Sequence, residues 1–222
     1  MIVPIGDRII NEACRFLALW NSNREPGEQP LCVHVNVSRL QLLLPDLVKV
    51  VRQSLNEHAV QSDCLHLEVT ETAIIDDPKS MIARLEELRE LGVRIDIDDF
   101  GTGYSSLSCL HQFPIDYLKL DRSFIANVQD TPEQTALLTA VVILADHLGL
   151  KVVAEGIENV DQLMTLKTLG CEFGQGFLFA PPMTSDQFQK YSSSPIEVHS
   201  GKKRSDTLES LDQQLKLCSP KD

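Results

Sequence analysis

Apolar and polar residues alternate along the chain in two different rhythms. Residues 6–20 place apolar side chains on one broad face at helical spacing, which predicts an amphipathic helix. Residues 31–38 form a short, apolar and β-branched run, which predicts a strand. Pro45 is a suitable first helical residue, so a helix is predicted from there to about Glu57. The chain therefore begins as helix, strand, helix.

The same alternation continues to the end of the apolar part of the chain. Five more strands are predicted at residues 65–69, 93–97, 117–120, 151–154 and 174–179. Helices are predicted between them, with Pro78, a capping box at Thr131 and Asn159 as start signals, and Gly92, Gly149 and Gly170 as stop signals. Strands separated by helices imply right-handed βαβ units and a parallel sheet.

A doubly wound sheet and a (β/α) barrel both satisfy this pattern, and the polar residues decide between them. Polar residues follow the carboxyl ends of many strands: Asn36, Glu68, Asp98, Asp99, Lys119, Asp121 and Glu155. A barrel brings all its strand ends to one mouth, whereas a doubly wound sheet concentrates its chemistry at one switch point. We therefore predict an α/β fold of the TIM-like (β/α) barrel type, with helices outside.

The acidic residues at this mouth indicate a metal site. Glu68, Asp98, Asp99 and Glu155 come from three strand ends, and Asn36 adds an oxygen from a fourth. Crowded carboxylates repel one another unless they are protonated or bind cations. Oxygen ligands without His or Cys suit Mg²⁺ or Mn²⁺, and adjacent Asp98 and Asp99 should point in different directions, so that one bridges two metals. Such a two-metal site is typical of phosphodiester hydrolysis.

Three neighbouring features have plainer alternatives. Lys119 could steady a phosphate oxygen or the attacking water, or be a solvated lysine at a strand exit. Glu71 is expected in a loop, where its carboxylate could simply cap backbone N–H groups. Gly101 and Gly103 give the loop after Asp99 the freedom to approach phosphate or change conformation.

Composition and charge narrow the class of protein. The 222 residues carry a formal net charge of −12, which argues against duplex nucleic acid as a partner. The six cysteines contain no CxxC pair, and the chain has no signal sequence or membrane-length apolar run, so a reduced, cytoplasmic protein is expected. We expect one domain over residues 1–191 and a mobile polar tail over 192–222.

The run Asp98-Asp99-Phe100-Gly101-Thr102-Gly103-Tyr104-Ser105-Ser106-Leu107 resembles the signature of EAL-domain cyclic di-GMP phosphodiesterases. Further motifs of that family follow in the same order, over about residues 1–190: Val35-Asn36-Val37-Ser38, Glu68-Val69-Thr70-Glu71, Leu118-Lys119-Leu120-Asp121, Ala154-Glu155-Gly156-Ile157-Glu158 and Gly174-Gln175-Gly176-Phe177. The resemblance implies a modified TIM barrel that cuts cyclic di-GMP to linear pGpG with Mg²⁺ or Mn²⁺.

The resemblance also assigns roles to single residues. It implies metal ligation by Asn36, Glu68, Asp98, Asp99 and Glu155, and a part in catalysis for Lys119, Gln175 and Glu155. Glu71 resembles the glutamate that holds the loop containing Gly101 and Gly103, a loop that couples metal binding to dimerisation in the family. Asp121 and Glu158 match supporting positions.

The chain departs from the family at its beginning. No Glu-Ala-Leu strand, with its nearby arginine, precedes Asn36. We therefore expect an incomplete barrel of about six strands, open sheet edges that favour a homodimer or aggregation, and weak hydrolysis by this chain alone. A longer parent protein could carry sensory, GGDEF or membrane segments. Three hypotheses stay open. The first is a phosphodiesterase domain, and the second is a noncatalytic module that binds cyclic di-GMP or a protein partner. The third is an unrelated metal-dependent barrel enzyme.

Overall fold

A computed structural model describes residues 1–24, 27–75, 78–101, 107–126 and 131–192. Its described residues contain one parallel sheet whose strand order follows the chain order. The six strands are β1 (Val33–Asn36), β2 (Leu65–Thr70), β3 (Arg94–Phe100), β4 (Tyr117–Leu120), β5 (Lys151–Ala154) and β6 (Phe173–Gly174). The predicted α/β fold class is confirmed.

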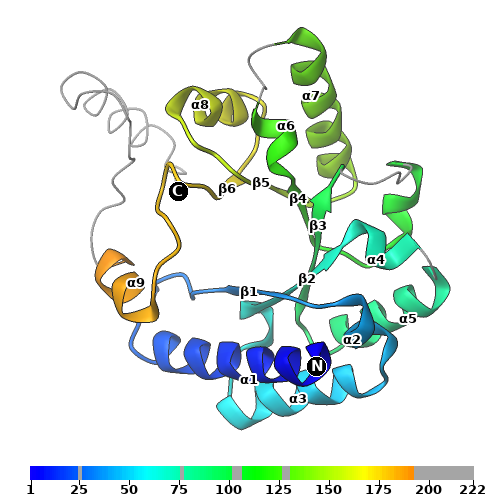
Figure 1. Ribbon diagram of the computed structural model, residues 1–222, viewed down its shortest axis with the longest axis vertical. Helices are drawn as coiled ribbons and strands as arrows, with labels where there is room; N and C mark the ends of the chain where they lie inside the picture. The colour runs from blue at the N-terminus through cyan, green and yellow to red at the C-terminus, as the bar shows by residue number, and fades with distance from the viewer. Residues whose placement is uncertain (25–26, 76–77, 102–106, 127–130, 193–222) are drawn as a thin grey trace.

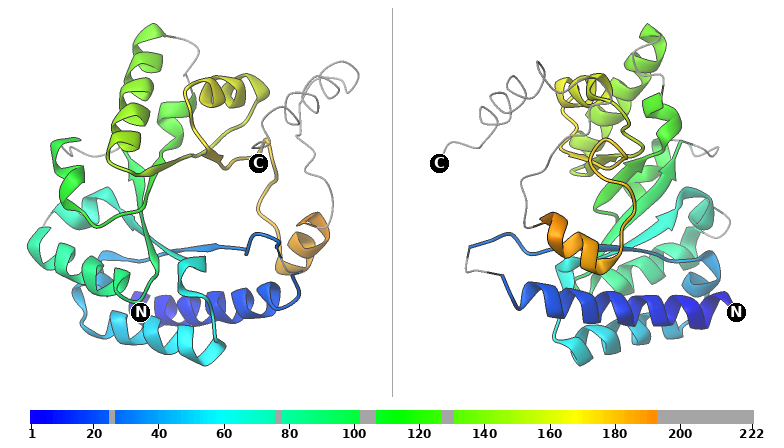
Figure 2. Two further views of the ribbon diagram at one scale, coloured as in Figure 1. Left: turned by 180° about the vertical axis from the view of Figure 1, so that it is seen from behind. Right: turned by 60° about the vertical axis from the view of Figure 1, so that its left-hand side comes forward.

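Helices cover the outer side of the sheet, which curls so that β1 and β6 lie at its two ends (Figure 1). They are α1 (Ile2–Asn21), α2 (Arg39–Leu43), α3 (Asp46–His58), α4 (Glu71–Ile75), α5 (Pro78–Arg89), α6 (Arg122–Ala126), α7 (Pro132–His147), α8 (Val160–Thr168) and α9 (Ser185–Ser192), with 3₁₀ turns at Ser62–Cys64 and Leu107–Gln112. Figure 2 shows α9 beside the end of α1, where the rings of Trp20 and Phe188 are 5.1 Å apart.

The two faces of the curled sheet differ in chemistry. Residues such as Val35, Leu67, Ile95 and Leu118 are buried and belong to the core that the sheet shares with the outer helices. The alternate positions carry polar side chains, and these face the inside of the curl. Because side chains alternate along a strand, the apolar ones face the core and the polar ones face the inside of the curl.

Helix ends largely follow their predicted signals. Asn159 and Gln162 form a reciprocal capping box at the start of α8, whereas Thr131 supplies only its own half of the predicted box, accepting from the Gln134 amide. The predicted stop residues Gly92, Gly149 and Gly170 all adopt positive φ. Of the helices in the described part of the chain, none combines the length and apolarity needed to cross a membrane.

Two predictions of local structure were wrong. The last strand was predicted over residues 174–179, but β6 ends at Gly174, because the next residues turn and bond to the loop after β5. Glu71 was predicted in a loop, but it is the first residue of α4. The predicted tail, apart from Ser192 at the end of α9, lies outside the described residues.

Candidate active site

Polar side chains from five neighbouring strands meet at the carboxyl ends of the sheet. We call Asn36, Glu68, Asp98, Asp99, Lys119 and Glu155 the mouth site. Asn36 lies in register with Glu68 on the neighbouring strand, and Lys119 lies in register with Val153, two residues before Glu155. The predicted convergence of strand ends is therefore present in the fold.

Lys119 lies at the centre of the mouth site. Its ammonium Nζ is 2.6 Å from Glu68 Oε1, 2.6 Å from Glu155 Oε1 and 3.1 Å from Asp98 Oδ1. Only 4% of the residue is exposed, so the alternative of a solvated lysine is wrong. A buried ammonium needs such partners, since an unpaired charge would be costly there.

The central lysine gives its neighbours different proton affinities. Burial lowers the pKa of Lys119, but the hydrogen bonds to Glu155 and Glu68 outweigh burial, and the net pKa is raised. Burial raises the pKa of Glu68, yet hydrogen bonds from His34 and Lys119 bring it below its usual value. For Glu155 burial prevails over Lys119, and its pKa is raised. Glu155 is thus the better proton acceptor of the two glutamates.

A β-bulge reshapes the end of β3. The register with β4 shifts between Ile97 and Phe100, and Asp99 adopts a positive φ of 53°. Simple alternation would turn Asp98 and Asp99 to opposite faces of the sheet, although both were expected at the metal site. Instead, oxygen atoms of Asp98, Asp99 and Glu155 all lie within 4.8 Å of one another. The bulge therefore adds a carboxylate to the cluster.

A glycine holds this turn close to α4 and α6. The Gly101 amide donates to Glu71 Oε2 at 2.9 Å, so Glu71 does bond a backbone N–H group. Gly101 has a φ of +94°, and a Cβ there would lie 1.9 Å from Phe124 Cε2. Only glycine fits this position without movement. Gly103, the other predicted loop residue, lies outside the described residues.

The remaining predicted residues lie around the mouth site. Gln175 is exposed, and its contacts in the described structure run through its backbone, from its amide to Ala154 O and from its carbonyl to the Ile157 amide. Asp121 accepts from the Ser123 amide at the start of α6. Glu158 forms an exposed ion pair with Arg122 at 2.8 Å. Asp121 and Glu158 thus have evident local partners of their own.

The mouth site fits a hard divalent cation. Its Glu68, Asp98, Asp99 and Glu155 carboxylates face a single ammonium, that of Lys119, so negative charge remains in excess. Burial raises the pKa of Asp99, and the nearby charges of Asp98 and Asp121 raise it further, as expected for a carboxylate in a repulsive cluster. Oxygen donors with excess negative charge are the usual setting for Mg²⁺, Mn²⁺ or Ca²⁺.

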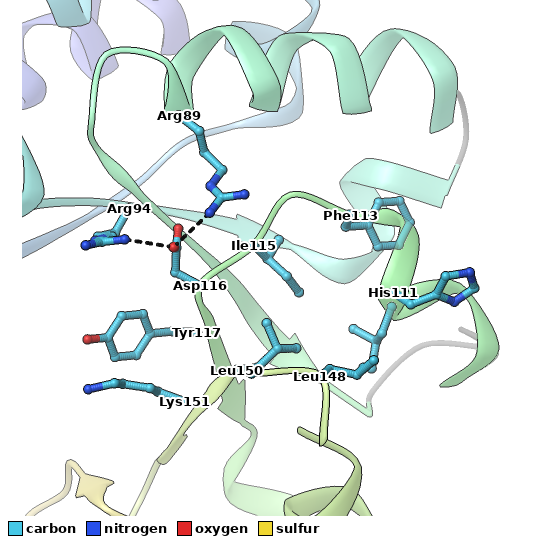
Figure 3. Close-up of a pocket in the computed structure, with 12 residues that line it drawn as sticks. Arg89, Arg94, His111, Phe113, Ile115, Asp116, Tyr117, Leu148, Leu150 and Lys151 are labelled. Atoms are coloured by element: carbon cyan, nitrogen blue, oxygen red, sulfur yellow. Dashed lines mark hydrogen bonds and ion pairs between the residues drawn. The ribbon is translucent and has the colours of Figure 1, made fainter. Parts of the chain in front are cut away.

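A separate cavity of about 510 Å³ lies at the opposite, amino ends of β3, β4 and β5 (Figure 3). It has a basic lining, but Asp116 accepts from both Arg89, at 3.3 Å, and Arg94, at 3.1 Å. Both guanidinium groups are therefore already paired with the Asp116 carboxylate. Side chains at this end of a barrel usually serve stability, so this cavity is not the better candidate for the active site.

A second polar layer on the inner face of the sheet was not predicted from the sequence. His34, His66 and Asp96 lie two residues before Asn36, Glu68 and Asp98 on the same strands, and their side chains are in contact. The strand predictions treated these positions as parts of apolar runs. The alternation of polar residues within β1, β2 and β3 was the signal that could have found them.

Comparisons with known proteins agree with this geometry. The EAL domain family matches residues 1–182. The signaling protein YkoW of Bacillus subtilis is 39% identical over 191 residues, which are 86% of this chain but 23% of YkoW. The chain thus spans about a quarter of that relative.

Solved structures give the same result in three dimensions. The PaMucR phosphodiesterase in complex with c-di-GMP superposes with a TM-score of 0.78 at 42% identity, over 84% of this chain and 74% of that one. The manganese and cyclic di-GMP complex of Klebsiella pneumoniae BlrP1 has a TM-score of 0.70 at 30% identity, over 79% of this chain and 45% of BlrP1.

Proposed function

Because the chain belongs to the EAL-domain family, we propose that its mouth site hydrolyses cyclic di-GMP to linear pGpG with bound Mg²⁺ or Mn²⁺. The observation that carries this proposal is the position of Lys119 among Glu68, Asp98 and Glu155, beside the turned-in Asp99. Four strands thereby concentrate one donor and several acceptors around a single point. Hydrolysis of a phosphodiester needs both: cationic donors for phosphate oxygens, and an acceptor for the proton of water.

Lys119 and Glu155 are proposed to take the donor and the acceptor role in this reaction. Lys119 stays protonated, so it acts as a donor that steadies a phosphate oxygen or the attacking water, and not as a base. Glu155, whose pKa is raised, is proposed to accept the water proton. Addition of water oxygen to phosphorus and cleavage of one ring P–O bond then leave the linear dinucleotide.

The metal ligands in this proposal are Asn36, Glu68, Asp98, Asp99 and Glu155. When bound, Mg²⁺ or Mn²⁺ would supply Lewis-acid stabilisation of phosphate charge and a more acidic water. The oxygen-only donor set favours these ions over zinc. The manganese complex of BlrP1, at 30% identity, supports Mn²⁺ as one candidate. Gln175 is proposed to approach the catalytic water, and its exposed position leaves its side chain accessible to a ligand.

The test is conversion of cyclic di-GMP to pGpG, measured by chromatography with Mg²⁺, with Mn²⁺ and with a chelator. Turnover should require metal and should be lost in Asp98→Asn and Lys119→Met. The matched control Glu90→Gln changes an exposed glutamate in the turn just after α5 and should leave turnover unchanged. Turnover that persists with chelator or in both variants would contradict the proposal.

A noncatalytic binding module is the second candidate. The specific observation in its favour is the exposure of Asn36 and Gln175, which leaves two proposed polar contacts open to solvent. Calorimetric titration with cyclic di-GMP separates the candidates. Saturable binding without any pGpG would establish the module, whereas binding together with metal-dependent turnover would establish the enzyme.

A homodimer and a cytoplasmic location complete the proposal. Strands β1 and β6 end the sheet within the described residues, and a second copy could pair with such edges. Sedimentation at several protein concentrations measures this directly. A single species with the mass of one chain at every concentration would rule the homodimer out.

A further inference from the structure

Beneath the mouth site, three side chains from three adjacent strands converge on the inner face of the sheet. His34 Nδ1 lies 2.7 Å from Asp96 Oδ2, and His66 Nδ1 lies 3.1 Å from both Asp96 oxygens. Asp96 is fully buried and His66 is 3% exposed, whereas the His34 side chain is 36% exposed. Two imidazoles and one carboxylate thus form one cluster, which solvent reaches at His34.

The three donor residues come from strands that pair with one another. His34 lies opposite His66 in the register of β1 with β2, and His66 pairs with Arg94, two residues before Asp96, in the register of β2 with β3. Two nearby cysteines do not belong to the group of donor atoms. Cys32 precedes β1 and is exposed, and Cys64 ends a 3₁₀ turn and is buried in the hydrophobic core.

We propose that His34, His66 and Asp96 bind a zinc ion, with a water molecule as the fourth ligand. Zinc takes four nitrogen, sulfur and oxygen ligands, and with bonds of about 2.1 Å its ligand atoms lie ~3.4 Å apart. All three pairs of His and Asp donor atoms lie within 4.8 Å of one another. The present separations of 2.7 and 3.1 Å are slightly shorter, so the ion requires only a small outward movement of the rings.

This site differs from the mouth site in the metal that it selects. The mouth offers oxygen atoms alone, whereas this layer offers two imidazole nitrogens beside one carboxylate, a donor set that favours zinc over magnesium. The two sites touch at Glu68, whose Oε1 is 2.6 Å from Lys119 Nζ and 3.4 Å from His34 Nδ1. Zinc binding does not depend on the proposed hydrolysis, and it can be measured without substrate.

The competing explanation is purely structural. The Asp96 carboxylate could serve only to fasten β1 and β2 to β3 through two hydrogen bonds, with no metal bound at any time. The two explanations differ in one measurable property. A cluster that is only hydrogen-bonded would not bind zinc saturably, and it would give no tetrahedral spectrum with Co²⁺ in place of zinc.

The experiment titrates the full, chelator-treated chain with Zn²⁺ and, in parallel, with Co²⁺, whose spectrum reports its ligands. One equivalent of zinc should bind, and cobalt should show the visible bands of a tetrahedral site. His34→Gln and Asp96→Asn should each weaken zinc binding about tenfold or more. Circular dichroism verifies that each variant folds. The cobalt spectrum of the unchanged chain tests the proposal without any variant.

Two controls separate this site from others on the chain. His147→Gln changes an exposed histidine on α7, and Glu155→Gln changes the mouth site; both should retain the zinc affinity of the unchanged chain. Absence of saturable zinc binding would overturn the proposal. So would an octahedral cobalt spectrum, or a loss of zinc affinity in Glu155→Gln that equals the loss in His34→Gln.

Discussion

The Gly101 amide donates a 2.9 Å hydrogen bond to Glu71 Oε2, and this contact joins the end of β3 to the first turn of α4. The backbone just after the proposed metal ligands Asp98 and Asp99 is thus tied to the helix that follows β2. Any loss of this tie releases the turn that brings Asp99 toward Asp98 and Glu155. The bond makes Glu71 a positioning residue for the mouth site.

Glu71→Ala should therefore weaken both the fold and metal binding. The lost charge-assisted bond should lower the free energy of unfolding by about 1 to 3 kcal/mol, and Mn²⁺ affinity should fall about tenfold. Denaturant unfolding and calorimetric titration measure the two effects. Glu71→Gln retains an acceptor and should recover part of each. The exposed Glu57→Ala on α3 is the control, and equal metal affinity in Glu71→Ala and this control would contradict the positioning role.

Gly101→Ala should destabilise the chain by two separable effects. The new Cβ would lie 1.9 Å from Phe124 Cε2, and the φ of +94° is unfavourable for alanine by about 1 to 3 kcal/mol. Gly170→Ala is the matched control, because its φ is +88° and no atom lies within 4 Å of the added Cβ. Chemical denaturation should show the larger loss at Gly101. In a Phe124→Ala background the extra loss should shrink to that of the control.

The sequence could predict the strands, but not how they meet. Each strand except the last was located within a few residues, because β-branched runs between helices are a local signal. The bulge at Asp99 was not predictable, since it results from pairing between β3 and β4, which are distant along the chain. The same holds for the burial of Lys119, which depends on acidic partners contributed by three other strand ends.

Residues of the layer below were missed for a related reason. His34, His66 and Asp96 each stand alone among apolar neighbours, so each can be taken as a single polar residue in a strand. Only the registers β1 with β2 and β2 with β3 bring the three side chains together. Convergence of this kind is a property of the sheet and not of any one segment.

Lys119→Met should destabilise the metal-free chain by about 3 to 5 kcal/mol, because it leaves the carboxylates of Glu68, Asp98 and Glu155 without their shared cation. Denaturant unfolding in chelator measures this loss. Mn²⁺ should stabilise the variant more than the unchanged chain, since the ion replaces the missing positive charge. Lys49→Met, at an exposed position on α3, should change stability little. Equal stability of Lys119→Met and the unchanged chain in chelator would show that the central ammonium does not balance the cluster.

Cys32 should be the first of the described thiols to be alkylated. It is exposed, and a hydrogen bond with His66 lowers its pKa against the opposing effect of burial. Burial raises the pKa of Cys14 and of Cys171 to about 11, which cuts the thiolate fraction of each about 100-fold at neutral pH. Iodoacetamide labelling of the chelator-treated chain, followed by peptide mass spectrometry over time, ranks the three. His66→Gln should slow the Cys32 reaction and leave Cys171 unchanged. Faster labelling of Cys14 or Cys171 than of Cys32 would mean that the Cys32 thiol is not activated by His66.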